Sequence, residues 1–196
     1  PTLAGVKSHV YTYGHRNPQG IVFGSDGTLY ASEHGPKTDD EINVIQVSKN
    51  YGWPRVAGYK NDKSAYAYWN WSADSNCANL TFSDQTCVTS AAPQTESSFT
   101  ALDFKEPIQT FFSVDNTYDF SGGYLTWPSI APSSLKIYES SKYTCPIPGW
   151  GNSLLTTSLK KGRVFRSKLA TDGQSIDVSG GDYEELFATD NNRFRC

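Results

Sequence analysis

The chain has 196 residues, of which 37% are hydrophobic and 14% aromatic, and its formal net charge is −3. This composition is typical of a folded domain with one sizeable core, and the weak negative charge provides no global basic field for nucleic acid or anionic lipid. No run of about 18 apolar residues predicts a membrane-spanning helix, and residues 1–20 lack the basic-then-apolar order of a secretion signal. We therefore expect neither nucleic acid nor a membrane among the partners.

Short runs of β-branched and aromatic residues, separated by Gly, Asp, Asn and Ser clusters, predict an all-β fold. Turns are expected at Asp26-Gly27, Lys161-Gly162 and Asp172-Gly173. The long polar stretch at 60–105 is expected to be an insertion loop within a single domain, 1–196. Repeated hairpins without helices favour a sandwich or the blades of a propeller. The expected strands are 20–24, 28–33, 41–47, 107–112, 135–140, 153–158, 163–169 and 184–188.

The length of the chain bears on the propeller interpretation. A blade takes about 40–45 residues, so 196 residues would supply roughly four blades of a ring that must close on itself. The chain starts at Pro1 and stops at NNRFRC without a closing strand after it. We interpret it as a segment of a longer domain.

Two loops near the N-terminus carry groups that a plain β-domain does not need. The stretch GHRNPQG places His15, Arg16 and Asn17 in consecutive positions, and SEHGP places a Gly35-Pro36 corner after His34. Carbonyl oxygens at such a corner are hard ligands of the type that Ca²⁺ prefers, and the acidic run at 39–41 would strengthen the negative potential there. The alternative interpretation is a solvated acidic turn after an ordinary hairpin.

Cations recur far along the chain, at Lys160-Lys161 and at Arg193 and Arg195. Because alternate residues of an extended segment face the same side, the two arginines can point together, and guanidinium groups suit the capture of carboxylates. Tyr124 and Trp127 could offer flat faces to a sugar or a cofactor ring. The alternatives are a solvated basic surface and core packing.

The four cysteines, Cys77, Cys87, Cys145 and Cys196, form no C-x-x-C pair, which disfavours a zinc site and favours disulfides. A bridge from Cys77 to Cys87 would contribute roughly 3 kcal/mol by loop closure, and Cys145 would be left for Cys196 by elimination only. Sequons at Asn70 and Asn79 lie in the same polar stretch. Together these features favour an extracellular, secreted protein, the alternative being four unpaired thiols in a cytosolic one.

Several reaction classes lack their usual motifs. The three histidines, at 9, 15 and 34, have no Ser or Cys nearby in a nucleophile-elbow context, and neither GxGxxG nor a Walker motif occurs. The sequence thus supports neither a hydrolase triad nor nucleotide binding by the usual loops.

Six motifs in order, YTYGHRNPQG, ASEHGPKTDDEIN, NYGWPRVAGYK, WPSIAPSS, SLKKG and NNRFR, resemble the soluble PQQ-dependent glucose/sorbosone dehydrogenases. The resemblance runs from about residue 8 to the end, broken mainly at 70–105 and 140–150. The sequons and the Cys-bearing insertion make the chain similar to the fungal pyranose dehydrogenases of that superfamily.

The resemblance implies a six-bladed β-propeller, of which this chain supplies the last three to four blades, with pyrroloquinoline quinone (PQQ) and Ca²⁺ on one face. It implies hydride transfer from a sugar hydroxyl carbon to the quinone, helped by Ca²⁺ as a Lewis acid. The expected cofactor contacts on the quinone side are Arg16, Asn17 and His34, and Arg16 is also the expected catalytic residue because it stabilises developing negative charge. The remaining roles implied are Ca²⁺ ligands at Gly35 and Pro36, cofactor carboxylate contacts at Lys160, Arg193 and Arg195, and a sugar pocket at Tyr124 and Trp127.

The resemblance also leaves questions open. His34 stands where bacterial relatives have Gln, and Asn61 where they have Asp, and no residue here matches the family's catalytic base, which the N-terminal half of the domain would supply. His15 is expected to shape its loop. The sugar is not specified, nor is the electron acceptor, for which a haem or cytochrome module is one option. The alternatives are a propeller that binds carbohydrate or a protein partner without catalysis, and a lactone-hydrolase-like propeller.

Overall fold

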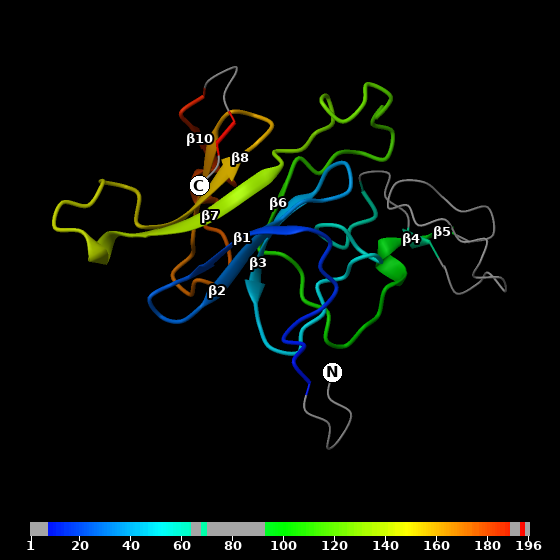
Figure 1. Ribbon diagram of the computed structural model, residues 1–196, viewed down its shortest axis with the longest axis horizontal. Helices are drawn as coiled ribbons and strands as arrows, with labels where there is room; N and C mark the ends of the chain where they lie inside the picture. Colours follow the sequence, from blue (N-terminus) through cyan, green and yellow to red (C-terminus); the bar gives the residue numbers. More distant parts are fainter. Residues whose placement is uncertain (1–7, 64–67, 70–92, 189–192, 195–196) are drawn as a thin grey trace.

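The computed structural model describes residues 8–63, 68–69, 93–188 and 193–194 (Figure 1). Two four-stranded antiparallel sheets form the body, in the orders β1-β2-β3-β6 and β10-β9-β8-β7, and a two-stranded sheet pairs β4 with β5. The strands are β1 (Pro18–Phe23), β2 (Leu29–Glu33), β3 (Asp40–Ile45), β4 (Tyr68–Trp69), β5 (Pro93–Gln94), β6 (Gln109–Phe111), β7 (Pro132–Glu139), β8 (Asn152–Ser158), β9 (Val164–Lys168) and β10 (Glu184–Leu186). Short 3₁₀ turns lie at Glu96–Ser98, Ser140–Lys142 and Val178–Gly180.

The all-β expectation is confirmed, and each of the eight expected strands corresponds to one of the observed strands, with ends shifted by a few residues. The described residues include no α-helix, and so none of them forms a helix long and apolar enough to cross a membrane. The described parts of 60–105 are not all loop, because β4 pairs with β5 there and a 3₁₀ turn follows. The sequence missed these elements because two-residue strands carry no periodic signal.

The hydrophobic core lies between the two large sheets. Phe111 of β6 and Phe165 of β9 are fully buried and meet edge-on, with ring centroids 5.4 Å apart. The sheets come closest where β1 runs beside β7 (Figure 1). A Cβ atom at Gly20 would lie 2.5 Å from the backbone nitrogen of Leu135, so only glycine allows this approach. The core members are Tyr30, Ile42, Val44, Phe111, Ile130, Leu135, Leu154, Phe165 and Leu169.

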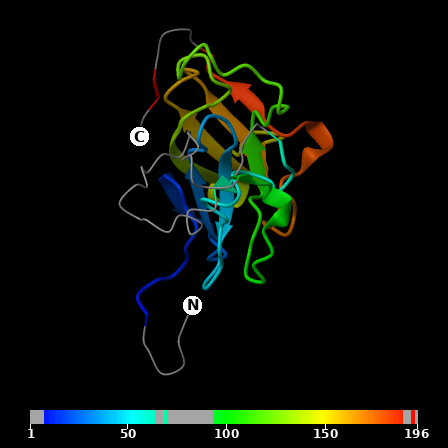
Figure 2. The same cartoon turned by 90° about the vertical axis from the view of Figure 1, so that its right-hand side faces the viewer.

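Antiparallel pairing brings four connections to one end of the sheets. These are the loop before β1, the β2–β3 loop, the β6–β7 crossover and the β8–β9 turn. The connection between β1 and β2, the loop after β7 and the β9–β10 connection lie at the opposite end, where the loop at 140–151 extends away from the sheets (Figure 1). Figure 2 shows the sheets from the side, with the blue segment that precedes β1 leading away from them. The described residues of GHRNPQG, SEHGP and SLKKG thus lie at the first end, together with Tyr124 and Trp127.

Candidate functional site

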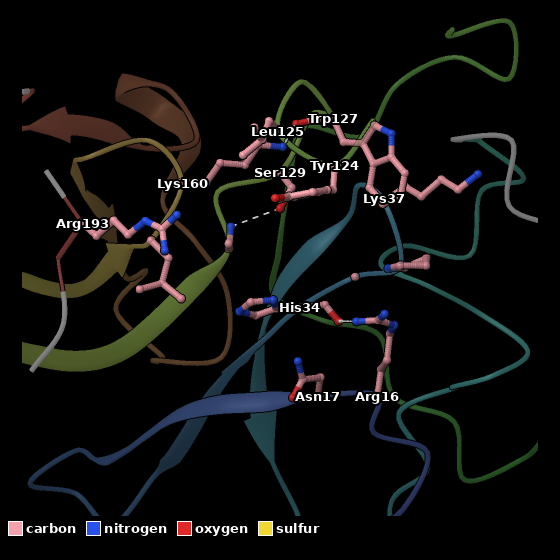
Figure 3. A pocket seen from close by; sticks show the side chains of 14 residues that line it. Arg16, Asn17, His34, Lys37, Tyr124, Leu125, Trp127, Ser129, Lys160 and Arg193 are labelled. Atoms are coloured by element: carbon pink, nitrogen blue, oxygen red, sulfur yellow. Dashed lines mark hydrogen bonds between the residues drawn. The ribbon is translucent and has the colours of Figure 1, made fainter. Parts of the chain in front are cut away.

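A cavity of about 570 Å³ opens at the end of the sheets where these four connections meet (Figure 3). Arg16 and Asn17 lie on one side of His34, and Lys160 and Arg193 lie on the other. The lining residues are Arg16, Asn17, His34, Gly35, Pro36, Lys37, Tyr124, Leu125, Trp127, Ser129, Ala131, Leu159, Lys160 and Arg193.

The backbone of Arg16 and Asn17 is held from behind by a buried carboxylate. Oε2 of Glu33 accepts hydrogen bonds from both backbone nitrogens, at 2.8 and 3.4 Å. The Arg16 guanidinium donates to the His34 carbonyl oxygen at 3.2 Å and lies over the Trp53 ring, 5.4 Å from its centroid. These contacts restrict the arginine before any ligand binds, so less entropy is lost on binding.

His15 faces the interior of this loop and does not line the cavity. Its Nδ1 lies 2.9 Å from Oε1 of Glu33, and its ring stacks on Tyr51 with centroids 4.5 Å apart. The Nε2 atom pairs with the Thr12 hydroxyl at 2.9 Å. With both nitrogens engaged, His15 shapes the loop, as the sequence predicts.

The Gly35-Pro36 corner is fixed on several sides. The Gly35 backbone nitrogen donates to Oδ1 of Asp40 at 3.0 Å, and Nε2 of His34 donates to the Pro132 carbonyl at 2.7 Å. A Cβ atom at Gly35 would lie 1.8 Å from the Thr38 carbonyl oxygen, so this position accepts glycine only. The corner is therefore a tight and specified feature.

The cationic wall of the cavity comes from the other sheet. Nζ of Lys160 donates to the Trp127 carbonyl, and burial, followed by the charge of Lys161, lowers the pKa of Lys160. Arg193 is placed beside it because the next residue, Phe194, donates its backbone N–H to the Ser158 carbonyl at 3.1 Å. Two cations from distant parts of the chain thus share one wall.

An aromatic rim completes the site. Tyr124 is 71% exposed, and Trp127 is half-buried with its indole N–H donating to the Phe120 carbonyl at 2.8 Å. Nζ of Lys37 lies 5.5 Å from the centroid of the Trp127 ring and 5.3 Å from that of Phe120. Neither Tyr124 nor Trp127 belongs to the hydrophobic core, so they are available to a ligand.

The acidic run at 39–41 is not a solvated turn, because all three side chains are buried. Asn43 bridges Glu33 and Glu41, donating from Nδ2 at 3.0 and 2.8 Å. Burial, followed by the charge of Glu33, raises the pKa of Glu41 well above its usual range. Burial also raises the pKa of nearby Glu96 to about 7. The sequence interpretation missed this burial because other donors to these carboxylates, such as the backbone nitrogens of Gly58 and Ile130, lie far away along the chain.

A family model described as glucose/sorbosone dehydrogenase matches residues 1–105. The chain belongs to the glucose/sorbosone dehydrogenase family. It is 43% identical over 203 aligned residues to quinoprotein glucose dehydrogenase B of Acinetobacter calcoaceticus, an alignment that covers 100% of this chain and 41% of that protein. It is also 46% identical over 52 residues to the aldose sugar dehydrogenase YliI of Escherichia coli, covering 26% of this chain and 14% of that protein. The chain thus spans about two fifths of the length of the Acinetobacter relative.

Two solved structures share the fold of this chain. A crystal structure of a glucose dehydrogenase superposes with a TM-score of 0.58 at 24% identity, covering 98% of this chain and 41% of that one. The PQQ-bound form of the aldose sugar dehydrogenase from Streptomyces coelicolor superposes with a TM-score of 0.52 at 21% identity, covering 96% of this chain and 35% of that one. At these identities the likeness concerns the fold alone.

In this member of the glucose/sorbosone dehydrogenase family, one cavity brings together nine of the site residues expected from the sequence. They are Arg16, Asn17, His34, Gly35, Pro36, Tyr124, Trp127, Lys160 and Arg193. The sequence missed Lys37, Leu125, Ser129, Ala131 and Leu159, which also line it. Lys37, Ser129, Ala131 and Leu159 lie inside the motifs ASEHGPKTDDEIN, WPSIAPSS and SLKKG, and Leu125 follows Tyr124, so the motifs contained these residues although they were not singled out.

Some expected features lie outside the described residues, namely Arg195, Cys77, Cys87, Cys196, Asn70 and Asn79. Cys145 is exposed, on the loop that extends away from the sheets, and its expected partner Cys196 is outside the described residues, so this pairing stays a prediction. Within the described ranges, no group of three or more His, Cys, Asp or Glu side chains is arranged to hold a metal ion.

Proposed function

We propose that the protein to which this chain belongs is a PQQ- and Ca²⁺-dependent dehydrogenase that oxidises a sugar hydroxyl. The observation that carries the proposal is the convergence of Arg16, Lys160 and Arg193 on one cavity that also contains the Gly35-Pro36 corner. The 43% identity to a quinoprotein glucose dehydrogenase supports it.

The residues present fit a flat, multiply charged quinone. Lys160 and Arg193 on one wall suit the carboxylates of the cofactor, and Arg16 and Asn17 on the other side suit the quinone oxygens. Leu125 and the half-buried Trp127 add apolar surface. A volume of about 570 Å³ lies in the usual range for cofactor sites.

The Gly35-Pro36 corner fits Ca²⁺ by the chemistry of its donors. Main-chain carbonyl oxygens are hard ligands, and Ca²⁺ accepts them together with oxygens supplied by a bound organic group. Because the Gly35 amide is held by Asp40 and the His34 carbonyl by Arg16, the corner is ordered in advance. We propose Gly35 and Pro36 as the protein's calcium ligands.

When bound in this cavity, PQQ would supply a hydride acceptor and Ca²⁺ a Lewis acid. The side chains of this chain then have separate roles. Arg16 places a fixed positive charge where negative charge develops, and Tyr124 and Trp127 form the rim that binds the sugar ring. We propose that the general base comes from outside this chain.

The finer features expected from the sequence are part of the same proposal. They are a secreted, glycosylated protein of the fungal pyranose dehydrogenase type, with disulfides, an electron acceptor such as a haem module, and a single six-bladed propeller domain. The pair of four-stranded antiparallel sheets, packed with β1 beside β7, supports neighbouring propeller blades.

The test is to titrate the full-length protein with PQQ, with and without Ca²⁺, and to follow the absorbance spectrum, the thermal midpoint and dye reduction with aldoses. We expect a saturable spectral change that requires Ca²⁺, a raised midpoint, and sugar-dependent reduction of the dye. An unchanged spectrum and midpoint at saturating PQQ and Ca²⁺ would refute the proposal. Sugar binding without redox activity would favour the carbohydrate-binding alternative.

A further inference from the structure

Asp40, the first residue of β3, is a buried carboxylate that bonds to both walls of the cavity without lining it. Its Oδ1 accepts from the Gly35 backbone nitrogen at 3.0 Å. Its Oδ2 accepts from the Ser129 hydroxyl at 2.8 Å and from the backbone nitrogens of Ile130 and Ala131 at 2.7 and 3.0 Å. One side chain therefore joins the β2–β3 loop to the segment that leads into β7.

The peptide between His34 and Gly35 is fixed at both ends by this arrangement. Its N–H donates to Asp40, while its carbonyl accepts from the Arg16 guanidinium at 3.2 Å. The His34 ring, in turn, donates to the carbonyl of Pro132 on the opposite wall at 2.7 Å. The floor of the cavity is thus oriented by contacts that run between the two sheets.

Neither loop alone provides all the hydrogen-bond donors that the Asp40 carboxylate uses. A buried carboxylate is costly unless it is well bonded, and here the four donors are divided between the loops of two different sheets. Both oxygens keep their partners only while the two walls hold one relative position. The bonding pattern therefore couples the position of Gly35 to that of the wall that carries Trp127 and Lys160.

We propose that Asp40 is a positioning residue that holds the two walls of the cavity in register. The inference rests on the proposed function, in which the two walls of the cavity bind opposite ends of one cofactor. Asp40 acts through Gly35 and the 129–131 segment and touches neither cofactor nor substrate.

A second buried carboxylate supplies a matched control. Glu139, the last residue of β7, also joins the two sheets, but at the end away from the cavity. Its Oε1 accepts from the backbone nitrogen of Ser25 at 2.9 Å and from the Ser25 hydroxyl, in the turn between β1 and β2. A variant at Glu139 weakens contact between the same two sheets without reaching the site.

The experiment compares D40N and E139Q in the full-length protein by amide hydrogen exchange without cofactor and by PQQ titration at saturating Ca²⁺. In D40N, the amide group presents a donor where a carboxylate oxygen accepted, so one wall is released. We expect faster exchange at 34–38 and 127–132 and about tenfold weaker PQQ binding, the size usual for residues behind a metal or cofactor shell. In E139Q, faster exchange is expected at 23–28 and 137–142, with PQQ affinity within about twofold of wild type.

Three outcomes decide the matter. If D40N leaves exchange at both walls as in wild type, Asp40 does not position them and the inference is wrong. If D40N speeds exchange at both walls but PQQ affinity changes no more than in E139Q, the role is merely structural and the inference is also overturned. Should D40N fail to fold, Ser129→Ala, which removes one of the four bonds, is expected to weaken PQQ binding about two- to threefold, and an unchanged affinity would count against the inference.

Failure of the proposed function is distinguishable from these results. In that case the wild-type protein itself would bind no PQQ, while the exchange of the two walls in D40N would still report whether Asp40 holds them.

Discussion

Charged side chains are arranged differently at the two ends of the sheet pair. At the end away from the cavity, cations are paired with carboxylates, as in Lys168–Asp177 at 2.7 Å and Arg166–Glu184 at 2.7 Å. At the cavity end Arg163 pairs with Glu185 at 2.7 Å, but no carboxylate among the described residues forms an ion pair with Lys37, Lys160 or Arg193. Asp40 and Glu41, at the same end, are buried and bond to backbone or neutral groups. This difference supports the proposal that the cavity binds an anionic ligand.

Two glycine substitutions, one at each end of the sheet pair, test this difference and are expected to have the largest effect. Gly35→Ala places a Cβ 1.8 Å from the Thr38 carbonyl, whereas Gly27→Ala, in the turn at the other end, meets nothing within 4 Å and strains only its φ of +87°. We expect G35A to abolish Ca²⁺-dependent PQQ binding, and G27A to retain it at a modest cost in stability. Titration calorimetry with PQQ checks both variants, and normal binding by G35A would remove the corner from the site.

The second comparison concerns two lysines. Lys160→Met removes a cation from the cavity wall, and Lys168→Met removes one that pairs with Asp177. A hydrogen bond to a charged group contributes about 1.5–3 kcal/mol, so K160M should weaken PQQ binding roughly 10- to 100-fold. K168M should leave the affinity unchanged. Equal affinities for K160M and K168M would mean that the unpaired cation serves no ligand.

The third comparison concerns two exposed tyrosines. Tyr124 is 71% exposed on the cavity rim, and Tyr143 is 51% exposed on the loop at the other end. If Tyr124 packs on the sugar ring, Tyr124→Ala should raise KM for the best aldose about fivefold with little change in kcat, because stacking contributes roughly 1 kcal/mol. Tyr143→Ala should change neither constant. Steady-state kinetics of the loaded enzyme measure both, and an unaltered KM in Y124A would place the sugar elsewhere.

The smallest expected effect concerns the buried carboxyl Glu41. Its pKa is raised, chiefly by burial, so its contribution to stability is present below the ordinary pKa and is lost as pH rises through the higher folded value. Glu41→Gln removes that loss. Between pH 5 and pH 9 we therefore expect the free energy of unfolding of the variant to rise, relative to that of wild type, by roughly 1 kcal/mol. Urea unfolding of both proteins at pH 5 and at pH 9 measures whether this stability difference grows as the pH rises. A difference that does not grow with pH would show that Glu41 is ionised in the folded protein.

Local patterns predicted the strands well because they are short runs rich in β-branched and aromatic residues, separated by Gly, Asp, Asn and Ser clusters. At Asp26-Gly27, for example, the Thr28 N–H bonds back to the Asp26 carboxylate within the same few residues. The motif residues of the site were predictable for a different reason, since the resemblance supplied their roles and the topology brings their loops to one end.

The supporting residues could not be predicted in the same way. Asp40 bonds to residues about 90 positions away, and no local signal reports such a partner. Its burial reverses the interpretation of DDEIN as a surface turn, because the backbone donors that make burial tolerable come from another sheet. The sequence thus predicted nine of the residues that line the cavity, while the burial of the carboxylates behind them emerged only from the packing of the two sheets.

Gly20 has a consequence for how the family can vary. It lies where β1 meets β7, and a methyl group there would press on the Leu135 nitrogen at 2.5 Å and act as a wedge. Arg16 and Asn17 immediately precede one of these strands, and Ser129 and Ala131 precede the other. The width of the cavity therefore depends partly on Gly20, which has no side chain. A substitution at Gly20 would widen the cavity without changing any residue that lines it.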